Sequence, residues 1–309
     1  MRTLVIGSRG SRLALWQAEW LRLRLLEAGR NSRVEIIRTS GDRFPDRSLA
    51  SMGGKGVFVK EIEEALLAGN VDVSVHSLKD LPTSQPDGLT IACVPEREDP
   101  RDILLAPGAP GPAGLRPGAV VGTGSPRRSC QMRALRPDVV IKDLRGNLDT
   151  RLRRLRTGDY DAILLASAGV RRLALEVEGT VLDYDQMIPA VGQGALAIEI
   201  RTDDRGLAEI LRPYDHAPTA IAVAAERALL RGLGGGCQAP IAAFGEVAGE
   251  RLSLRALVAG PGGEPLLKER REGDARDAEA IGLDAARVLL ARGASALVQG
   301  TSAPLPDAP

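Results

Sequence analysis

The sequence predicts an α/β protein made of two similar lobes and a small C-terminal α+β domain. Three observations support this fold class. Strands and helices alternate up to residue 75, the same order restarts near residue 119, and a different pattern begins near residue 219. Alternating strands and helices favour a parallel sheet with crossover helices. A length of 309 residues also exceeds what one hydrophobic core usually holds.

The first lobe opens with an apolar strand, Leu4–Ile6, and a turn, Gly7–Ser11, rich in glycine and serine. Ser11 is a typical N-cap for the next helix, because its hydroxyl can accept from free backbone N–H groups. Apolar residues then recur at helical spacing, at Leu13, Trp16, Trp20 and Leu23. The remaining predicted elements are a strand at 34–38, a loop at 40–56, a helix at 57–68 and a strand at 71–75.

The second lobe repeats this order after a segment rich in proline and glycine. A strand at 119–121 leads into the turn Gly122–Ser125, and Pro126 begins a helix at the position where proline is favoured. A strand at 139–141, a helix at 148–155 and a strand at 162–165 complete the lobe. Two such lobes predict a ligand cleft between them.

The last third of the chain predicts the α+β domain. A helix at 219–230 precedes the loop Gly234–Pro240, and strands at 251–259 and 265–271 flank a Gly-Pro-Gly-Gly turn, as in a hairpin. A helix at about 277–290 follows. The tail at 301–309 has too little apolar content to order itself.

Composition argues against several functional classes. Forty-one basic residues against 40 acidic ones leave no excess positive charge for nucleic acid. Three widely spaced cysteines and two histidines argue against a disulfide framework and a metal site. No apolar run approaches membrane-spanning length, and no apolar leader precedes the first strand. We therefore expect a cytoplasmic protein that binds neither nucleic acid nor membrane.

Each lobe begins with a turn suited to bind an anion. Free backbone N–H groups and the helix dipole favour negative charge at a helix N-terminus. Arginine, which binds carboxylates at two points, accompanies both turns together with hydroxyl side chains. The residues are Ser8, Arg9 and Ser11 in the first turn, and Thr123, Ser125, Arg127 and Arg128 in the second. One such turn is a weak signal, but two predict a cleft for a polyanion. A further arginine pair, Arg145 and Arg151, follows the strand at 139–141.

The segment His76–Pro82 leaves the carboxyl end of a predicted strand. An acid at this place would project into the cleft, where Asp80 could transfer a proton or stabilise a cation. Lys79 beside it could attract a carboxylate. From spacing alone, the alternative that Asp80 only caps the turn before Pro82 is favoured.

The loop Gly234–Pro240 places Cys237 directly after three glycines. Such a bare loop lets a bulky group approach the sulfur closely. The residues alone leave two interpretations open: a small buried cysteine in a turn, or a thiol used as a nucleophile or covalent anchor. A cysteine-dependent hydrolase or transferase would want a histidine base, and only His76 and His216 are present.

Seven segments closely resemble the porphobilinogen deaminase family, in the order expected and over nearly the whole length. They are GSRGSRLALWQA at 7–18, GGKGVFVKE at 53–61, HSLKDLP at 76–82, EDPRD at 98–102, LRGN at 144–147, PAVGQGA at 189–195 and GGCQ at 235–238. The resemblance implies that Cys237 holds a dipyrromethane cofactor through a thioether. It also implies that four porphobilinogen molecules are joined head to tail with loss of ammonia. Hydrolysis would then release hydroxymethylbilane for tetrapyrrole (heme) biosynthesis.

The resemblance also implies roles for single residues. Asp80 would assist the loss of ammonia and stabilise cationic intermediates, and Arg9 and Arg145 would be catalytic beside it. The implied cofactor-binding residues are Cys237, Lys79, Asp80, Thr123, Ser125, Arg127, Arg128, Arg145 and Gly146. The implied substrate-binding residues are Arg9, Ser11, Phe58, Arg145, Arg151 and Arg172. The loop at about 42–56 would cover the site, with Ser51 where many bacterial relatives have a basic residue.

The domain boundaries follow from the same resemblance. Residues 1–97 and 195–213 would form the first lobe, residues 98–194 the second, and residues 217–309 the C-terminal domain of a monomer. The lobes resemble bacterial periplasmic binding proteins, so a non-catalytic binder of a small polyanion is the alternative function. Cys237 and the third domain weigh against it, because a binder needs no anchored thiol.

Overall fold

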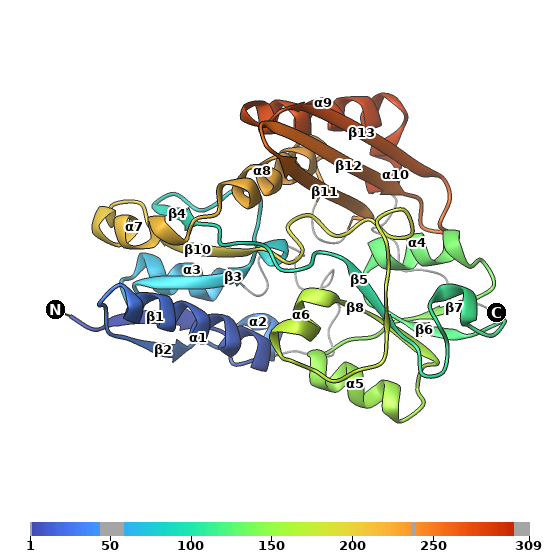
Figure 1. Ribbon diagram of the computed structural model, residues 1–309, viewed down its shortest axis with the longest axis horizontal. Helices are drawn as coiled ribbons and strands as arrows, with labels where there is room; N and C mark the ends of the chain where they lie inside the picture. Colours follow the sequence, from blue (N-terminus) through green and yellow to red (C-terminus); the bar gives the residue numbers. More distant parts are fainter. Residues whose placement is uncertain (1, 44–58, 236–238, 300–309) are drawn as a thin grey trace. The chain divides into compact units, whose positions relative to one another are not determined.

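The computed structural model describes residues 2–43, 59–235 and 239–299. The predictions made for Ser51, Phe58, Cys237, most of the loop at 42–56 and the tail at 301–309 lie outside these residues. The chain divides into two compact units, residues 1–98 with 194–220 and residues 99–193 with 221–309. Figure 1 shows the elements of each unit.

The first unit contains a five-stranded sheet in the order β2-β1-β3-β10-β4. Its strands are β1 (Leu4–Ser8), β2 (Ser32–Ile36), β3 (Val73–Ser77), β4 (Leu89–Cys93) and β10 (Leu196–Arg201). Strand β1 pairs in parallel with β2 and β3, whereas β10 runs antiparallel to both β3 and β4. The sheet is therefore mixed and not parallel as predicted, because β10 returns from a distant part of the sequence.

Helices cover both faces of this sheet. The unit contains α1 (Arg12–Glu27), α2 (Ser40–Arg43), α3 (Lys60–Leu67) and α7 (Arg205–Leu211), with 3-10 turns η2 (Leu78–Asp80) and η4 (Arg212–Tyr214). Leucines of α1 and α7 pack with Ile6, Val73 and Val75, while Leu66 of α3 packs with Val71 and Leu89. The buried face of α1 carries Ala18, Leu21 and Leu25. The predicted face is wrong at Leu23, which is 41% exposed, because leucines surround this helix and spacing alone could not select among them.

The second unit begins with a sheet of the same design, in the order β7-β6-β8-β5-β9. Its strands are β5 (Asp102–Leu105), β6 (Val120–Gly122), β7 (Val140–Lys142), β8 (Ala162–Ala166) and β9 (Thr180–Val181). Strand β6 is parallel to β7 and β8, and β5 is antiparallel to β8 and β9. Its helices are α4 (Pro126–Leu135), α5 (Leu148–Arg156) and α6 (Ser167–Arg172), with the 3-10 turn η3 (Pro112–Gly114).

The C-terminal part of this unit contains an antiparallel sheet of β11 (Ile241–Ala248), β12 (Arg251–Ala259) and β13 (Leu266–Asp274). The predicted hairpin is β12 and β13, and β11 is an additional strand. The helices here are α9 (Ala278–Ala291), α10 (Ala294–Gln299) and the part of α8 (Ala217–Gly232) from Ile221 onward, with the 3-10 turn η5 (Ala275–Asp277). The core is built from small and branched residues such as Ala225, Leu229, Leu254 and Leu289. The predicted fold class, two α/β lobes and a small α+β domain, is confirmed.

Among the helices that the structure describes, none combines the length and the apolar character needed to cross a membrane.

Candidate active site

The carboxyl edge of the first sheet gathers four predicted residues of the first lobe. Because β1 and β3 are parallel neighbours, with Ile6 opposite Val73, the segments that follow them reach the same edge. One segment carries Arg9 and Ser11, and the other carries Lys79 and Asp80. The Ser11 hydroxyl accepts a hydrogen bond from the Ala14 backbone N–H at 3.3 Å, so the predicted N-cap of α1 is confirmed.

The turn that presents Asp80 is firmly anchored. Leu78 and Leu81, on either side of it, are only 2% and 3% exposed. The Leu78 N–H donates to the Ala195 carbonyl at 3.0 Å, and the Leu81 N–H donates to the Leu78 carbonyl at 3.2 Å. Asp80 itself is exposed, and within the described residues its carboxylate has no hydrogen-bond partner. In this part of the chain Asp80 therefore does not cap its own turn and is available to a ligand.

The second sheet has a corresponding edge at the ends of β6 and β7. The Thr123 N–H donates to the Lys142 carbonyl at 3.0 Å, which joins the two strand ends. The buried Thr123 hydroxyl accepts from the Ser125 N–H at 3.2 Å. Unlike Ser11, Ser125 precedes its helix without a capping bond from its side chain. The Ser125 hydroxyl therefore lies at the N-terminus of α4 uncommitted to the helix.

The segment after β7 holds the second arginine group. The Arg145 Nε donates to the Asp143 carboxylate, and the Arg151 Nε donates to the Gly146 carbonyl at 2.8 Å. Gly146 has a φ of +97°, and a Cβ atom there would lie 2.9 Å from Cγ2 of Thr150. Asn147 caps α5 by accepting from the Thr150 N–H at 3.0 Å. A glycine is thus needed where the chain turns between the two arginines.

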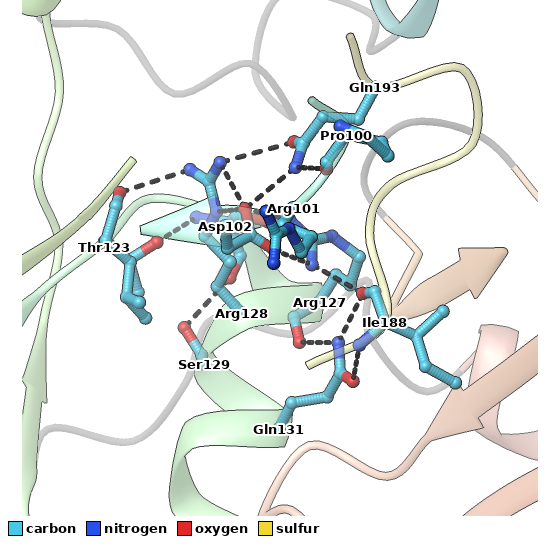
Figure 2. Close-up of polar contacts among 12 residues, drawn as sticks. Pro100, Arg101, Asp102, Thr123, Arg127, Arg128, Ser129, Gln131, Ile188 and Gln193 are labelled. Atoms are coloured by element: carbon cyan, nitrogen blue, oxygen red, sulfur yellow. Dashed lines mark hydrogen bonds and ion pairs between the residues drawn. The ribbon is translucent and has the colours of Figure 1, made fainter. Parts of the chain in front are cut away.

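Arg127 and Arg128 are buried, at 3% and 6% exposed, and both bind Asp102, which is fully buried. Arg127 places Nη1 2.6 Å from Oδ2 and Nη2 3.1 Å from Oδ1 of Asp102, and Arg128 places Nε 2.8 Å from Oδ1. Figure 2 shows both guanidinium groups converging on this one carboxylate. The group therefore holds two cations and one anion.

Neighbouring amides and carbonyls hold this Asp102 cluster in place. Gln193 donates from Nε2 to Asp102 at 3.0 Å and to the Pro100 carbonyl at 2.7 Å. Arg127 also donates to the Ile188 carbonyl at 2.8 Å. Burial by itself raises the pKa of Asp102, but the two guanidinium groups outweigh it and hold the pKa below its ordinary value. The carboxylate is therefore ionised, and within the cluster two guanidinium groups share one negative charge.

Three predicted site residues remain. Arg172 is half-buried at the end of α6, and its neighbour Arg171 forms an ion pair with Asp99 at 2.9 Å. Phe58 and Cys237 lie outside the described residues. In the part of the chain that is described, no group of three or more His, Cys, Asp or Glu side chains could hold a metal ion.

Sequence reasoning missed Asp102 and Gln193 as parts of the site. Both belong to segments that resemble the family, but neither was given a role. The available signal was the pair of arginines at the start of α4, because arginines buried this deeply require an acid partner. Nothing in the local sequence indicates which of 40 acidic residues supplies it.

Comparison with known proteins gives a consistent assignment. Residues 4–209 match the family model described as the dipyrromethane cofactor binding domain of porphobilinogen deaminase, and residues 220–291 match its C-terminal domain. Among curated proteins, the porphobilinogen deaminase of Geobacillus kaustophilus is 48% identical over 99% of this chain and 100% of that protein.

Two further relatives give the same result. The porphobilinogen deaminase of Syntrophotalea carbinolica is 48% identical over 96% of this chain and 95% of its own. That of Bacillus velezensis is 46% identical over 96% of both chains. Two family models together cover most of the chain, and relatives at this identity match almost its full length. Both results point to the same family. The chain belongs to the porphobilinogen deaminase family.

Proposed function

We propose that this chain joins four porphobilinogen molecules head to tail, with loss of ammonia, and releases hydroxymethylbilane by hydrolysis. The observation that carries the proposal is the exposed carboxylate of Asp80, which has no hydrogen-bond partner among the described residues and is held on an anchored turn at the same sheet edge as Arg9. An acid that is fixed in place yet open to a ligand suits proton transfer and stabilisation of a developing cation. Family membership supplies the substrate.

Asp80 has two tasks in this proposal. Its carboxylate accepts a proton from the reacting centre, and its negative charge stabilises positive charge that develops there. The buried leucines on both sides of the turn keep the carboxylate from moving away when it changes protonation state. Arg9 and Lys79, at the same edge, bind substrate carboxylates and balance the charge of Asp80.

The residues of the second unit fit a dipyrromethane that carries acetate and propionate groups. The Asp102 cluster holds two cations and one anion next to the N-terminus of α4, and the Ser125 hydroxyl is not used as a cap. Both features favour a bound carboxylate. When bound, the dipyrromethane supplies the nucleophilic pyrrole carbon to which new units are added. We place its thioether on Cys237, with Thr123, Ser125, Arg127, Arg128, Arg145 and Gly146 around it.

The other substrate contacts are also part of the proposal. Ser11, Phe58, Arg151 and Arg172 complete the group that binds carboxylates or covers the ring of porphobilinogen. We further propose that the enzyme works in the cytoplasm as a monomer. Size-exclusion chromatography with light scattering tests the monomer, and a dimer mass at working concentration would reject it.

Intact-mass spectrometry tests the cofactor assignment. Protein produced in a heme-synthesising host should exceed its sequence mass by two linked pyrrole units, and Cys237→Ser should remove this excess. Cys130→Ser is the matched control, because Cys130 is a buried thiol of the same unit. An unmodified protein with full activity would overturn the proposal.

Asp80→Asn tests the catalytic role. The substitution keeps the size of the side chain and removes its charge and basicity, so turnover should fall by about 100-fold or more. The cofactor mass should remain. Asp87→Asn, at an exposed acid seven positions later, should leave turnover unchanged. Near-normal turnover of Asp80→Asn would refute the assignment.

A further inference from the structure

Three ionisable side chains lie buried together in the first unit. Glu63, His76 and Glu199 are 7%, 5% and 0% exposed. In the pairing of β3 with β10, Glu199 is opposite Ser74 and Ala197 is opposite His76, so Ser74, His76 and Glu199 share one face of the sheet. Helix α3, which carries Glu63, packs on both strands. None of the three belongs to the site described above.

A side-chain hydrogen bond joins the two strands within this group. Nε2 of His76 lies 3.0 Å from Oε2 of Glu199 and 2.7 Å from the Ser74 hydroxyl oxygen. A carboxylate can only accept, so Nε2 must carry the proton that makes the first contact a hydrogen bond. The bond ties His76 to β10 four residues before Asp80.

A second bond holds the same strand end from the opposite face. Gln17 of α1 donates from Nε2 to the Ser77 hydroxyl oxygen at 2.8 Å. Side chains alternate along a strand, so Ser77 points away from the face that carries His76. Two successive residues, one on each face, therefore fix the end of β3. The turn that presents Lys79 and Asp80 starts at the next residue.

The elements that could bring other ionisable groups close to His76 are α3, β10 and the neighbouring strands. Burial and the neighbouring Glu199 raise the pKa of Glu63 to about 7, although His76 lowers it. Glu63 therefore holds its proton up to about neutral pH. The charged residues of α3 and β10 pair elsewhere: Lys60 with Glu64, Glu61 with Ser40, and Arg201 with Asp72. Strands β1 and β4 contribute no charged residue, and on β3 the only ionisable residue is His76.

We propose that His76 and Glu199 are positioning residues for Asp80, because their hydrogen bond locks the end of β3 to β10 and so fixes the turn that carries the carboxylate. The inference rests on the proposed function, in which Asp80 acts on the substrate. Displacement of a reacting group by about 1 Å can cost on the order of 100-fold in rate, so a loosened strand end should be visible in turnover.

Two substitutions of one residue separate positioning from packing. Glu199→Gln keeps an oxygen that accepts from Nε2 of His76, whereas Glu199→Leu keeps the bulk and removes the acceptor. Replacement of a buried ion by a well-packed apolar side chain is often neutral or stabilising, so a packing role predicts that the Leu variant performs at least as well as the Gln variant. Positioning predicts kcat within about threefold of wild type for Glu199→Gln and at least about tenfold lower for Glu199→Leu.

The controls make a loss of kcat interpretable. Both variants should carry the cofactor mass, so reduced turnover cannot be attributed to a missing cofactor. Glu19→Gln, at a glutamate of α1 that pairs with Arg22, should behave as wild type. A folded Glu199→Leu protein with wild-type kcat would overturn the inference. If wild type itself does not consume porphobilinogen, the proposed function fails instead.

Nitrogen-15 NMR of the histidine rings gives a readout that needs neither activity nor a stable variant. The chain has only two histidines, and His216 is recognised by the contact of its Nδ1 with the Thr219 hydroxyl at 2.8 Å. Nε2 of His76 should carry the proton that it donates to Glu199. An unprotonated Nε2 in the native protein would mean that this hydrogen bond is absent and would overturn the inference, even if Glu199→Leu fails to fold.

Discussion

Substitution of Asp102 by Asn tests whether one buried carboxylate holds Arg127 and Arg128 in place. The Asn side chain has nearly the same shape and keeps one acceptor oxygen, so the change is mainly in charge. The two guanidinium groups are 3% and 6% exposed and share the carboxylate through contacts of 2.6 Å, 3.1 Å and 2.8 Å. Both guanidinium groups are too deeply buried for water to take the place of the lost negative charge.

The expected cost follows from the charge left behind. Removal of one partner of a buried ion pair typically costs about 3–5 kcal/mol, because the other charge stays buried without compensation. Here two cations lose the same anion and then repel each other, so we expect a loss of free energy of unfolding in this range. A domain with an ordinary stability of about 5–15 kcal/mol would still fold, but it would unfold at markedly lower denaturant concentration.

Urea denaturation followed by far-ultraviolet circular dichroism is the appropriate assay. Tryptophan fluorescence would report on the wrong unit, because Trp16 and Trp20 both lie in α1. Asp138→Asn is the control, since that carboxylate pairs with Arg136 at the surface and its loss should be barely measurable. In the double variant Asp102→Asn with Arg128→Met, one cation is removed too, and part of the stability should return. An Asp102→Asn protein within about 0.5 kcal/mol of wild type would refute the charge argument.

Two further predictions concern the other buried acid and the turn between the arginines. Burial and Glu199 raise the pKa of Glu63 from 4.5 to about 7, so its contribution to stability is complete below about pH 4.5 and is lost as the pH rises through 7. Glu63→Gln should remove this loss, so above pH 7 its free energy of unfolding should exceed that of wild type by up to about 3 kcal/mol. Urea denaturation at several pH values measures this difference, and a difference that does not change with pH would contradict the prediction. Gly146→Ala should cost about 1–2 kcal/mol in the same assay, because of the left-handed backbone and the contact with Thr150. Gly158 is the control: its φ of +79° is also positive, but a Cβ atom added there would have no heavy atom within 4 Å. Gly158→Ala should therefore lower the free energy of unfolding by less than Gly146→Ala. Equal losses would show that the contact with Thr150 has no effect.

The sequence predicted the repeated parts of the fold better than the returning ones. A short apolar run beside a glycine-rich turn or a helix end is a recognisable sequence pattern. It marks strands β1, β3, β6, β7 and β8. Strand β10 lies between β3 and β4 although about 120 residues separate it from β3. Only the family resemblance indicated that the chain returns to the first sheet. Hydrophobic periodicity predicts that a segment is a strand, but it does not show which strand that segment pairs with. For the same reason, the sequence pattern could not predict that β5 runs antiparallel to its neighbours.

For the candidate site, local sequence predicted where the polar groups gather but not how they are paired. The prediction that arginines follow the strand ends of both lobes could be made because parallel strands end at one edge. Pairing depends on tertiary contacts: Asp102 lies 25 residues before Arg127, and Glu199 lies 123 residues after His76. Because local sequence does not show tertiary contacts, spacing alone favoured a capping role for Asp80. The described residues do not support that role.

The two anion turns show why pairing matters for function. They share one sequence pattern, yet Ser11 is used to cap its helix whereas Ser125 is not, and Arg127 and Arg128 are buried against an acid. A buried, acid-held arginine loses little entropy when a ligand binds, because its geometry is already fixed. Its charge is also partly neutralised, which limits how tightly a carboxylate is held. The second turn thus suits a permanently tethered polyanion that needs orientation more than affinity, and the exposed edge at Asp80 suits a substrate that arrives and reacts.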